Sequence, residues 1–178
     1  MRPELVASGN ALAERAGFTG LTFAAGTIQN WTAPRLDMLI ALHACDTATD
    51  EALAAGVKAG AKVIVAAPCC HKQVRLAMHP VRELSALTGH GILAERQAEL
   101  LTDTLRALFL ESRGYQTSVF EFISTEHTAK NIMITAVHHG KSNARATAQA
   151  EPLKQAFGVT EHRLETLLGS PPVSELDP

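Results

Sequence analysis

"LDMLIALHACDTATDEALAAGVKAGAKVIVAAPCCHK", from Leu36 to Lys72, decides the fold. It holds two nearly unbroken apolar runs, 36–45 and 61–70, separated by a helical pattern that a glycine ends. Continuous apolar runs of this length are typical of strands that are buried on both faces in a parallel sheet. Two such strands joined by a helix predict a right-handed βαβ unit, so both strands run in the same direction. Each run ends in cysteine, and histidine and aspartate stand beside the cysteines.

The flanking sequence extends this alternation of helices and strands. We predict a helix over 3–16, a short strand over 21–29 and a long helix over 92–113. Two strands, 115–124 and 131–139, are close enough to form a hairpin, which adds one antiparallel strand at an edge of the sheet. A polar link, 141–150, then leads to two short helices and a frayed end. The class is therefore α/β, a mostly parallel sheet with a terminal antiparallel hairpin and helices on both faces.

Composition excludes several classes of protein. The 178 residues carry a formal net charge of −2, so no global positive field favours nucleic acid or an anionic membrane. No apolar stretch reaches the ~20 residues that cross a bilayer, and no signal peptide is evident. Three cysteines, two of them adjacent, make a poor disulfide framework, which favours a reducing, cytoplasmic compartment.

Ligands of open parallel sheets bind at the carboxyl ends of the strands. Three groups of residues fall at such ends: Gly26-Thr27-Ile28, His43-Ala44-Cys45-Asp46 and Pro68-Cys69-Cys70-His71. The link between the last two strands, with His127, Lys130 and Asn131, falls at the same edge. The sequence therefore predicts one cleft lined by all of these residues.

The motifs "LIALHACDTATD", "APCCHK", "HGILAERQAELLTDTLRALFLESRGY" and "FEFISTEHTAKNIMI" resemble an uncharacterised family of class I S-adenosylmethionine-dependent methyltransferases. They also resemble, more distantly, the tRNA 2′-O-methyltransferases that modify the acceptor stem. The resemblance covers about residues 1–140, which we take as a partial methyltransferase domain, and leaves 141–178 as a linker and short helical tail.

This resemblance implies a Rossmann-like methyltransferase sheet of seven strands, with 21–29 as its third strand. The first two strands and the glycine-rich turn would precede Met1, so we expect the chain to be the C-terminal part of the catalytic domain. The isolated chain is then expected to bind S-adenosylmethionine feebly or not at all. An exposed sheet edge should also associate with the missing N-terminal part or with a second copy.

The resemblance also assigns roles to residues. Gly26, Thr27, Ile28, His43 and Ala44 are expected to contact the cofactor. A proton acceptor for a hydroxyl group is expected among three residues, Asp46, His71 and His43. Substrate contacts are expected from Cys69, Cys70, Lys72, Arg75 and His127, because basic groups beyond the second strand favour RNA phosphates.

Structural roles compete with these assignments. Asp46 and Asp50 would equally serve as N-caps of the following helix, as would Thr47 or Thr49. Cys45, Cys69, Cys70 and His71 form an alternative zinc set, but adjacent cysteines point apart on an extended chain, so we predict no metal site. A nucleophilic Cys69 or Cys70 would need His71 or His43 as its base.

The sequence thus favours a methyltransferase that acts on RNA. The alternatives are a non-catalytic fragment that serves as a binding or assembly module, and a Cys/His metal-binding protein.

Overall fold

The computed structural model describes residues 3–31, 35–42 and 44–169. It divides the chain into two units, Met1–Thr32 and Ala33–Pro178. Within the described residues, no helix is both long enough and apolar enough to cross a membrane.

The first unit consists of helix α1 (Pro3–Arg15) and the segment that folds back along it. The Asn10 side chain holds this segment, since its Nδ2 donates to Phe23 O at 2.9 Å and its Oδ1 accepts from Phe23 N at 2.7 Å. Gly9 faces the Phe23 ring, which an added Cβ would approach to 3.0 Å. Residues 21–25 are not a strand, and Ile28–Asn30 form a 3₁₀ helix instead. The predicted strand over 21–29 is therefore wrong for this structure.

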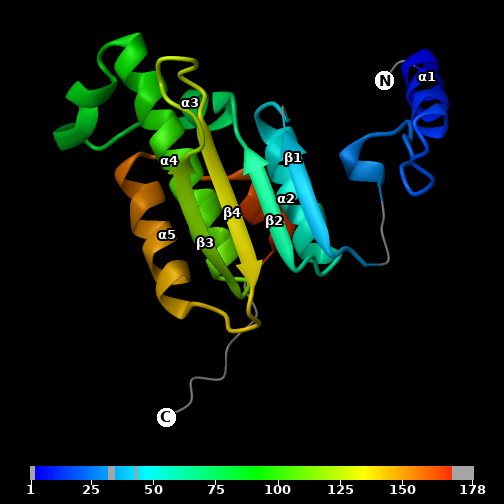
Figure 1. Cartoon of the computed structure of the whole chain (residues 1–178). Helices are drawn as coiled ribbons and strands as arrows, with labels where there is room; N and C mark the ends of the chain where they lie inside the picture. Colours follow the sequence, from blue (N-terminus) through cyan, green and yellow to red (C-terminus); the bar gives the residue numbers. More distant parts are fainter. Residues whose placement is uncertain (1–2, 32–34, 43, 170–178) are drawn as a thin grey trace. The chain divides into compact units, whose positions relative to one another are not determined.

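The second unit is built on an open sheet of four strands in the order β1-β2-β4-β3 (Figure 1). These strands are β1 (Met38–Leu42), β2 (Val63–Ala67), β3 (Tyr115–Glu121) and β4 (Ile132–His138). β1 and β2 are parallel, with Leu42 beside Ala67, whereas β4 is antiparallel to both β2 and β3. Three strands therefore run in one direction. β3 and β4 form the predicted hairpin, but the expected edge position of the antiparallel strand is wrong, because β4 lies between β2 and β3.

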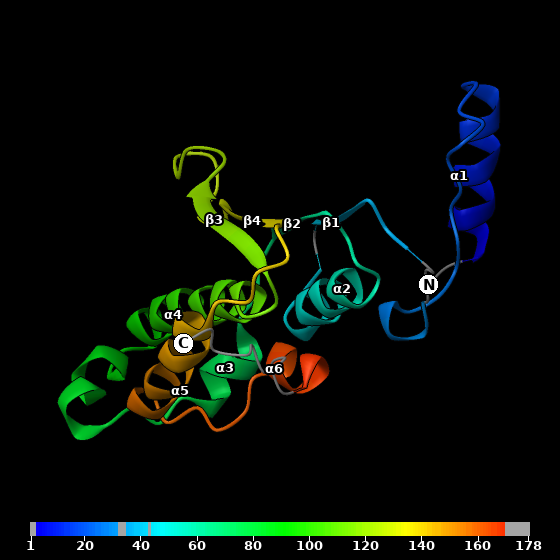
Figure 2. The same cartoon turned by 90° about the horizontal axis from the view of Figure 1, so that it is seen from below.

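The helices of this unit are α2 (Thr47–Lys58), α3 (Lys72–Ala77), α4 (Gly91–Glu111), α5 (Ala144–Ala156) and α6 (Arg163–Leu168), with a 3₁₀ helix at Arg82–Thr88. Figure 2 shows them on one face of the sheet. The expectation of helices on both faces is thus met on one face only within this unit. α5 also begins inside the segment that we predicted to be a polar link.

The core lies between the sheet and this helical layer. Alternate strand residues point into it and are 0–1% exposed: Ile64, Ala66, Ile134 and Ala136. Leu53, Leu105 and Leu110 cover them from α2 and α4 and are equally buried. Period-two alternation along β2 and β4 therefore places one set of side chains in the core and the other set on the uncovered face.

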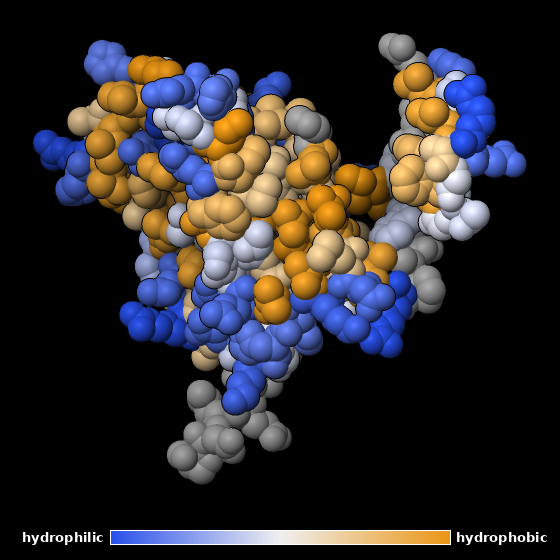
Figure 3. Space-filling model, viewed as in Figure 1, coloured by the Kyte–Doolittle hydropathy of each residue, from blue (hydrophilic) through white to orange (hydrophobic). Residues whose placement is uncertain are grey.

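The uncovered face is apolar over β1. Met38, Ile40 and Leu42 are 50–60% exposed, and the sequence pattern had predicted that β1 is buried on both faces. Figure 3 shows the resulting apolar surface over β1 and β2. Because β1 is also the edge strand of the described sheet, one row of its backbone groups has no strand partner within the described residues.

Candidate functional site

The carboxyl ends of β1 and β2 bring the three cysteines together. Cys45 lies three residues beyond β1, and Cys69 and Cys70 follow Pro68 beyond β2. Cys69 Sγ lies 3.5 Å from Cys45 Sγ and 3.6 Å from Cys70 Sγ. The prediction that the two strand ends share one rim is confirmed for these residues. The expectation that adjacent cysteines point apart is wrong, because the chain turns after Pro68 instead of continuing as a strand.

All three cysteines are free thiols. Burial raises the pKa of the Cys69 thiol to about 12, and its thiol neighbours Cys45 and Cys70 act in the same direction. A thiolate is the nucleophilic form of cysteine. A raised pKa therefore disfavours the nucleophilic-cysteine alternative for Cys69.

Asp46 connects the starts of two helices. It has φ of +52°, the only positive φ of a non-glycine residue within the described chain. Its Oδ1 accepts from Gln73 N at 3.0 Å, and its carbonyl accepts from Arg106 Nη2 at 3.1 Å. The side chain thus binds α3 and does not cap α2, contrary to the N-cap interpretation. One carboxylate oxygen is already engaged, and proton acceptance by Asp46 stays a prediction.

Two other expected caps of α2, Thr49 and Asp50, are also wrong. Thr49 Oγ1 donates to the carbonyl of Ala44, so it stabilises the turn before the helix. Asp50 is buried in an ion pair with Arg106, at 2.8 Å between Oδ1 and Nε and 3.0 Å between Oδ2 and Nη2. Both side chains therefore bond to groups outside α2, and neither caps the first N–H groups of this helix.

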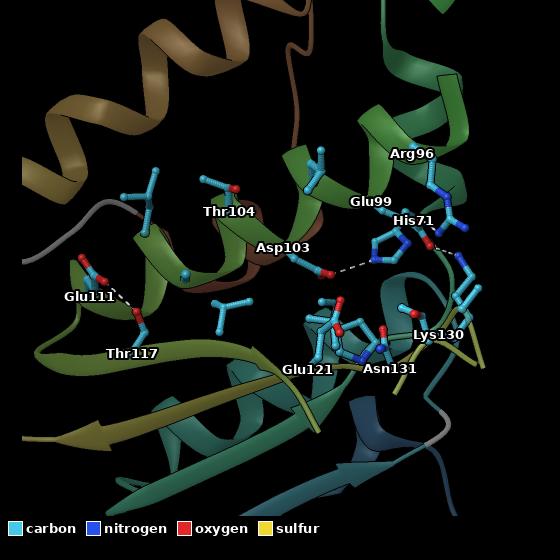
Figure 4. A pocket seen from close by; sticks show the side chains of 18 residues that line it. His71, Arg96, Glu99, Asp103, Thr104, Glu111, Thr117, Glu121, Lys130 and Asn131 are labelled. Atoms are coloured by element: carbon cyan, nitrogen blue, oxygen red, sulfur yellow. Dashed lines mark hydrogen bonds and ion pairs between the residues drawn. The ribbon is translucent and has the colours of Figure 1, made fainter. Parts of the chain in front are cut away.

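A cavity of about 710 Å³ lies on the helical side of the same rim (Figure 4). Its walls are α4, β3, the start of β4 and the segment between these strands. Apolar groups line its floor and helix wall: Pro68, Leu100, Ala107, Leu108, Val119, Ala129 and Ile132. Leu100 of α4 is 64% exposed and lines this cavity. The space is suited to a mainly apolar or flat ligand.

His71 lines this cavity and is oriented by Asp103. His71 Nε2 lies 3.2 Å from Asp103 Oδ2, and the ring is 3% exposed. A carboxylate only accepts, so Nε2 carries the proton and Nδ1 presents a lone pair. Nδ1 is buried and has no hydrogen-bond partner among the described residues. His71 is a residue of the cavity lining, and a buried ring nitrogen without a hydrogen-bond partner is unusual in a folded protein.

Arg106 fixes Asp103 in turn. Its Nη1 donates to Asp103 Oδ1 at 3.0 Å, while its other donors bind Asp50 and the Asp46 carbonyl. Arg106 is fully buried, and these carboxylates raise its pKa against the opposing effect of burial. A continuous chain of side chains therefore runs from α2 through α4 to His71, and it holds the imidazole in one orientation.

Charged groups surround the mouth of the cavity. Glu99 accepts from Arg96 at 2.8 Å and pairs with Lys130. Burial would raise the pKa of Glu99, but the hydrogen bonds from Lys130 and Arg96 outweigh it and lower the pKa. Lys130 and Asn131 thus line the cavity with His71, as the common rim predicted, whereas His127 does not line it and is exposed.

The residues predicted to contact the cofactor belong to different units. Gly26, Thr27 and Ile28 belong to the first unit, where Thr27 Oγ1 accepts from Asn30 N and caps the 3₁₀ helix. Ala44 belongs to the second unit, and His43 lies outside the described residues. None of the described members of this set lines the cavity. The cofactor assignment therefore stays a prediction.

The basic residues proposed for substrate contact differ in their surroundings. Lys72 is exposed at the first position of α3. Arg75 is paired with Glu95 at 2.8 Å between Nε and Oε2, so its charge is partly neutralised.

Sequence reasoning missed Asp103 and Arg106. Both interrupt the apolar stripe of α4 between Leu101 and Leu110, and they stand three residues apart on one helical face. Charged residues are almost never fully buried unless they are paired. Two of them within the apolar stripe of α4 are therefore the signal that would have identified Asp103 and Arg106.

Comparison with known proteins gives one match. Residues 1–77 match a family model described as a methyltransferase domain, and this segment contains β1, β2 and the cysteine-bearing turns. The match supports a methyltransferase family for this part of the chain. No curated protein and no solved structure matches the chain.

Proposed function

We propose that the chain is part of a methyltransferase that uses S-adenosylmethionine as methyl donor. The observation that carries the proposal is the match of residues 1–77 to a methyltransferase domain. The sheet supports it, because the order β1-β2-β4-β3 with an antiparallel β4 agrees with the terminal half of the sheet that the sequence resemblance implies. We also propose, from its free thiols, that the protein works in the reducing cytoplasm.

The proposed proton acceptor is His71. The bound cofactor supplies the methyl group, and the acceptor molecule must lose a proton when a hydroxyl or amine is methylated. His71 Nδ1 takes that proton, and the Asp103 carboxylate, 3.2 Å from Nε2, stabilises the resulting imidazolium. Asp103 touches His71 and not the acceptor, so it is a positioning residue. Of the predicted cofactor residues, Gly26, Thr27 and Ile28 belong to the first unit and Ala44 to the second.

Calorimetric titration with S-adenosylhomocysteine tests the cofactor. It is carried out on this chain and on the product that includes any in-frame codons upstream of Met1. Binding should be weak in the first and saturable in the second, because strands adjoining β1 complete the cofactor site in the proposal. Saturable binding in either form supports the proposal, and its absence in both overturns it.

RNA is the proposed acceptor class. Lys72 is exposed at the rim, and the sequence resembles enzymes that modify the acceptor stem of tRNA. Transfer of labelled methyl groups to bulk tRNA should be detected and should decrease with added salt, because phosphate contacts release counterions. Transfer to protein but not to tRNA would remove RNA and retain the methyltransferase.

Substitution of His71 tests its role. His71→Ala should lower the transfer rate by about 10²- to 10⁴-fold, which is the usual contribution of a general base. His139→Ala, a change at an exposed histidine outside the cavity that is not among the expected substrate contacts, is the matched control and should leave the rate unchanged. Equal rates for the two variants would exclude His71 as the base.

A second candidate function is that of a non-catalytic binding module. The observation that favours it is the apolar uncovered face of β1, with Met38, Ile40 and Leu42 exposed. The proposed occupant is an apolar α/β segment whose strand pairs with the edge of β1. The alternative occupant is a second copy of this chain. Light scattering of the purified chain tests it, because a stable dimer would favour the second copy over the proposed segment.

A further inference from the structure

The three thiols form a compact cluster. Cys69 Sγ is at its centre, 3.5 Å from one neighbour and 3.6 Å from the other, and all three sulfur atoms lie within 4.8 Å of one another. Zinc–thiolate bonds of about 2.3 Å in a tetrahedron place sulfur atoms about 3.8 Å apart. Two of the three spacings therefore lie within a few tenths of an ångström of a metal-bound set.

The surroundings of the cluster differ from those of structural cysteines. A structural cysteine is usually fully buried among apolar groups. Here Cys45 is exposed and Cys69 and Cys70 are half-buried, so the cluster lies near the surface of the protein. Every cysteine of the chain takes part, although Cys45 and Cys69 stand 24 positions apart in the sequence. The hydrophobic effect alone gives no reason to collect thiols at an open strand end.

Rigid elements hold the ligand-bearing turns. The parallel pairing of β1 and β2 places Leu42 beside Ala67, and the cysteines follow immediately. Asp46 then fixes the first turn to the second through its 3.0 Å bond with Gln73 N. A site whose ligands stand on fixed elements loses little conformational entropy when it binds a metal ion.

We propose that Cys45, Cys69 and Cys70 bind one zinc ion as thiolates and leave a fourth position open to water or to a ligand. Three thiols lose three protons on binding, and the site then carries one net negative charge. The N-terminus of the twelve-residue helix α2, which begins two residues after Cys45, stabilises that charge through its dipole. Soft thiolate ligands disfavour Mg²⁺ and Ca²⁺, which prefer oxygen. His71 is not included as a ligand, because among the described residues only the three cysteine sulfur atoms form a group of potential ligand atoms within 4.8 Å of one another.

Cobalt substitution tests the site directly. The reduced full chain is titrated with Co²⁺ alone. Two signals should appear, thiolate-to-cobalt charge-transfer bands and intense bands in the visible range, and both should saturate at one ion per chain. Zn²⁺ should then abolish these bands. Elemental analysis of protein purified without a histidine tag should also find zinc near one equivalent. A titration that gives no charge-transfer band overturns the proposal.

Single substitutions identify the ligands. Cys45→Ser, Cys69→Ser and Cys70→Ser should each weaken metal binding by at least about tenfold, because each removes one thiolate. His127→Gln removes an exposed potential ligand outside the cluster and is the matched control. Circular dichroism confirms that the variants are folded. Metal affinity that is unchanged in Cys69→Ser, or lost in the control, contradicts the three-thiolate site.

A disulfide between Cys45 and Cys69 is the competing outcome. Their sulfur atoms are not bonded at 3.5 Å, but closing this distance needs only a small shift. Thiol titration of protein purified without reductant separates the two outcomes, with the Cys45–Cys69 peptide sought by mass spectrometry. One free thiol together with that linked peptide overturns the zinc proposal. The test uses no methyl donor, so its result is independent of the proposed methyl transfer.

Discussion

The two faces of the sheet are built from the same strands and have opposite environments. On the covered face, Ile64 and Ile134 are 0–1% exposed beneath α2 and α4, and on the other face Ile40 is 60% exposed. Both faces of β1 and β2 are apolar in sequence. Within the second unit, helices cover one face, while the apolar character of the other face indicates that it binds a further apolar surface.

The largest effect is expected from the buried ions on the covered side. Arg106→Met leaves Asp50 and Asp103 buried without their partner and should lower the free energy of unfolding by about 3–5 kcal/mol. Urea denaturation followed by circular dichroism measures the change. Arg96→Met, which breaks a surface pair with Glu99, is the matched control and should cost less than about 1 kcal/mol. Similar losses in the two variants would mean that the buried network is not a major source of stability.

Matched isoleucine substitutions compare the two faces directly. Ile134→Ala, beneath the helices, should cost about 2–5 kcal/mol because it creates a cavity in the core. Ile40→Ala, on the uncovered face, should cost well under half of that loss in the chain alone. The same denaturation experiment measures both. A large loss for Ile40→Ala would show that this face is already covered in solution.

Acid should destabilise the covered side through His162. Burial lowers the pKa of His162 to about 4 from its ordinary 6.5, and the nearby positive charges of Arg106 and Lys154 act with it against Asp50 and Asp103. Between pH 6.5 and 4 the unfolded chain binds a proton that the folded chain does not, so stability decreases as the pH falls through this window. The loss should reach about 3 kcal/mol.

Denaturation midpoints across this pH window measure that loss. His162→Gln should flatten the profile, and His127→Gln at the exposed position should not. A profile that is steep in all three proteins would assign the acid sensitivity to carboxylates instead.

The smallest effect on stability, and the largest on association, is expected at the uncovered face. Ile40→Lys should change the free energy of unfolding little, because its side chain is mostly solvated. It should reduce concentration-dependent association, since a charge on an edge strand opposes pairing. Sedimentation velocity measures association. Lys58→Ile, which places an apolar side chain on α2, is the control that tests whether an apolar substitution elsewhere on the surface increases association. Unchanged association in Ile40→Lys would place self-association elsewhere.

Local patterns predicted the second unit well. The apolar runs before Cys45 and Cys69 correctly predicted β1 and β2. The hairpin pattern correctly predicted β3 and β4. Residues 21–29 alternate like a strand, but in the structure they bind α1 through Asn10, and a strand needs a neighbour that the pattern cannot reveal. The first half of α5, which lies in the predicted polar link, was missed because its small residues lack an apolar stripe, although Asn143 caps the helix by accepting from Ala146 N.

The candidate site was predicted in part for the same reason. Strand ends determine which residues meet, so the gathering of the cysteines and the position of His71 followed from topology. The partners of His71 come from α4, more than 30 residues away, and only tertiary packing brings Asp103 to it. The helix-cap interpretation of Asp46 and Asp50 failed because Arg106 and Gln73, distant in sequence, compete for these carboxylates.

Hydrogen–deuterium exchange with S-adenosylhomocysteine tests the central claim most directly. The measurement uses the chain together with any segment encoded in frame upstream. If the ends of β1 and β2 form a methyltransferase site, the ligand should slow exchange in the peptides that cover 43–50 and 67–74 and leave α5 and α6 unchanged. Slowed exchange confined to α5 and α6, or no change anywhere at saturating ligand, would contradict the account.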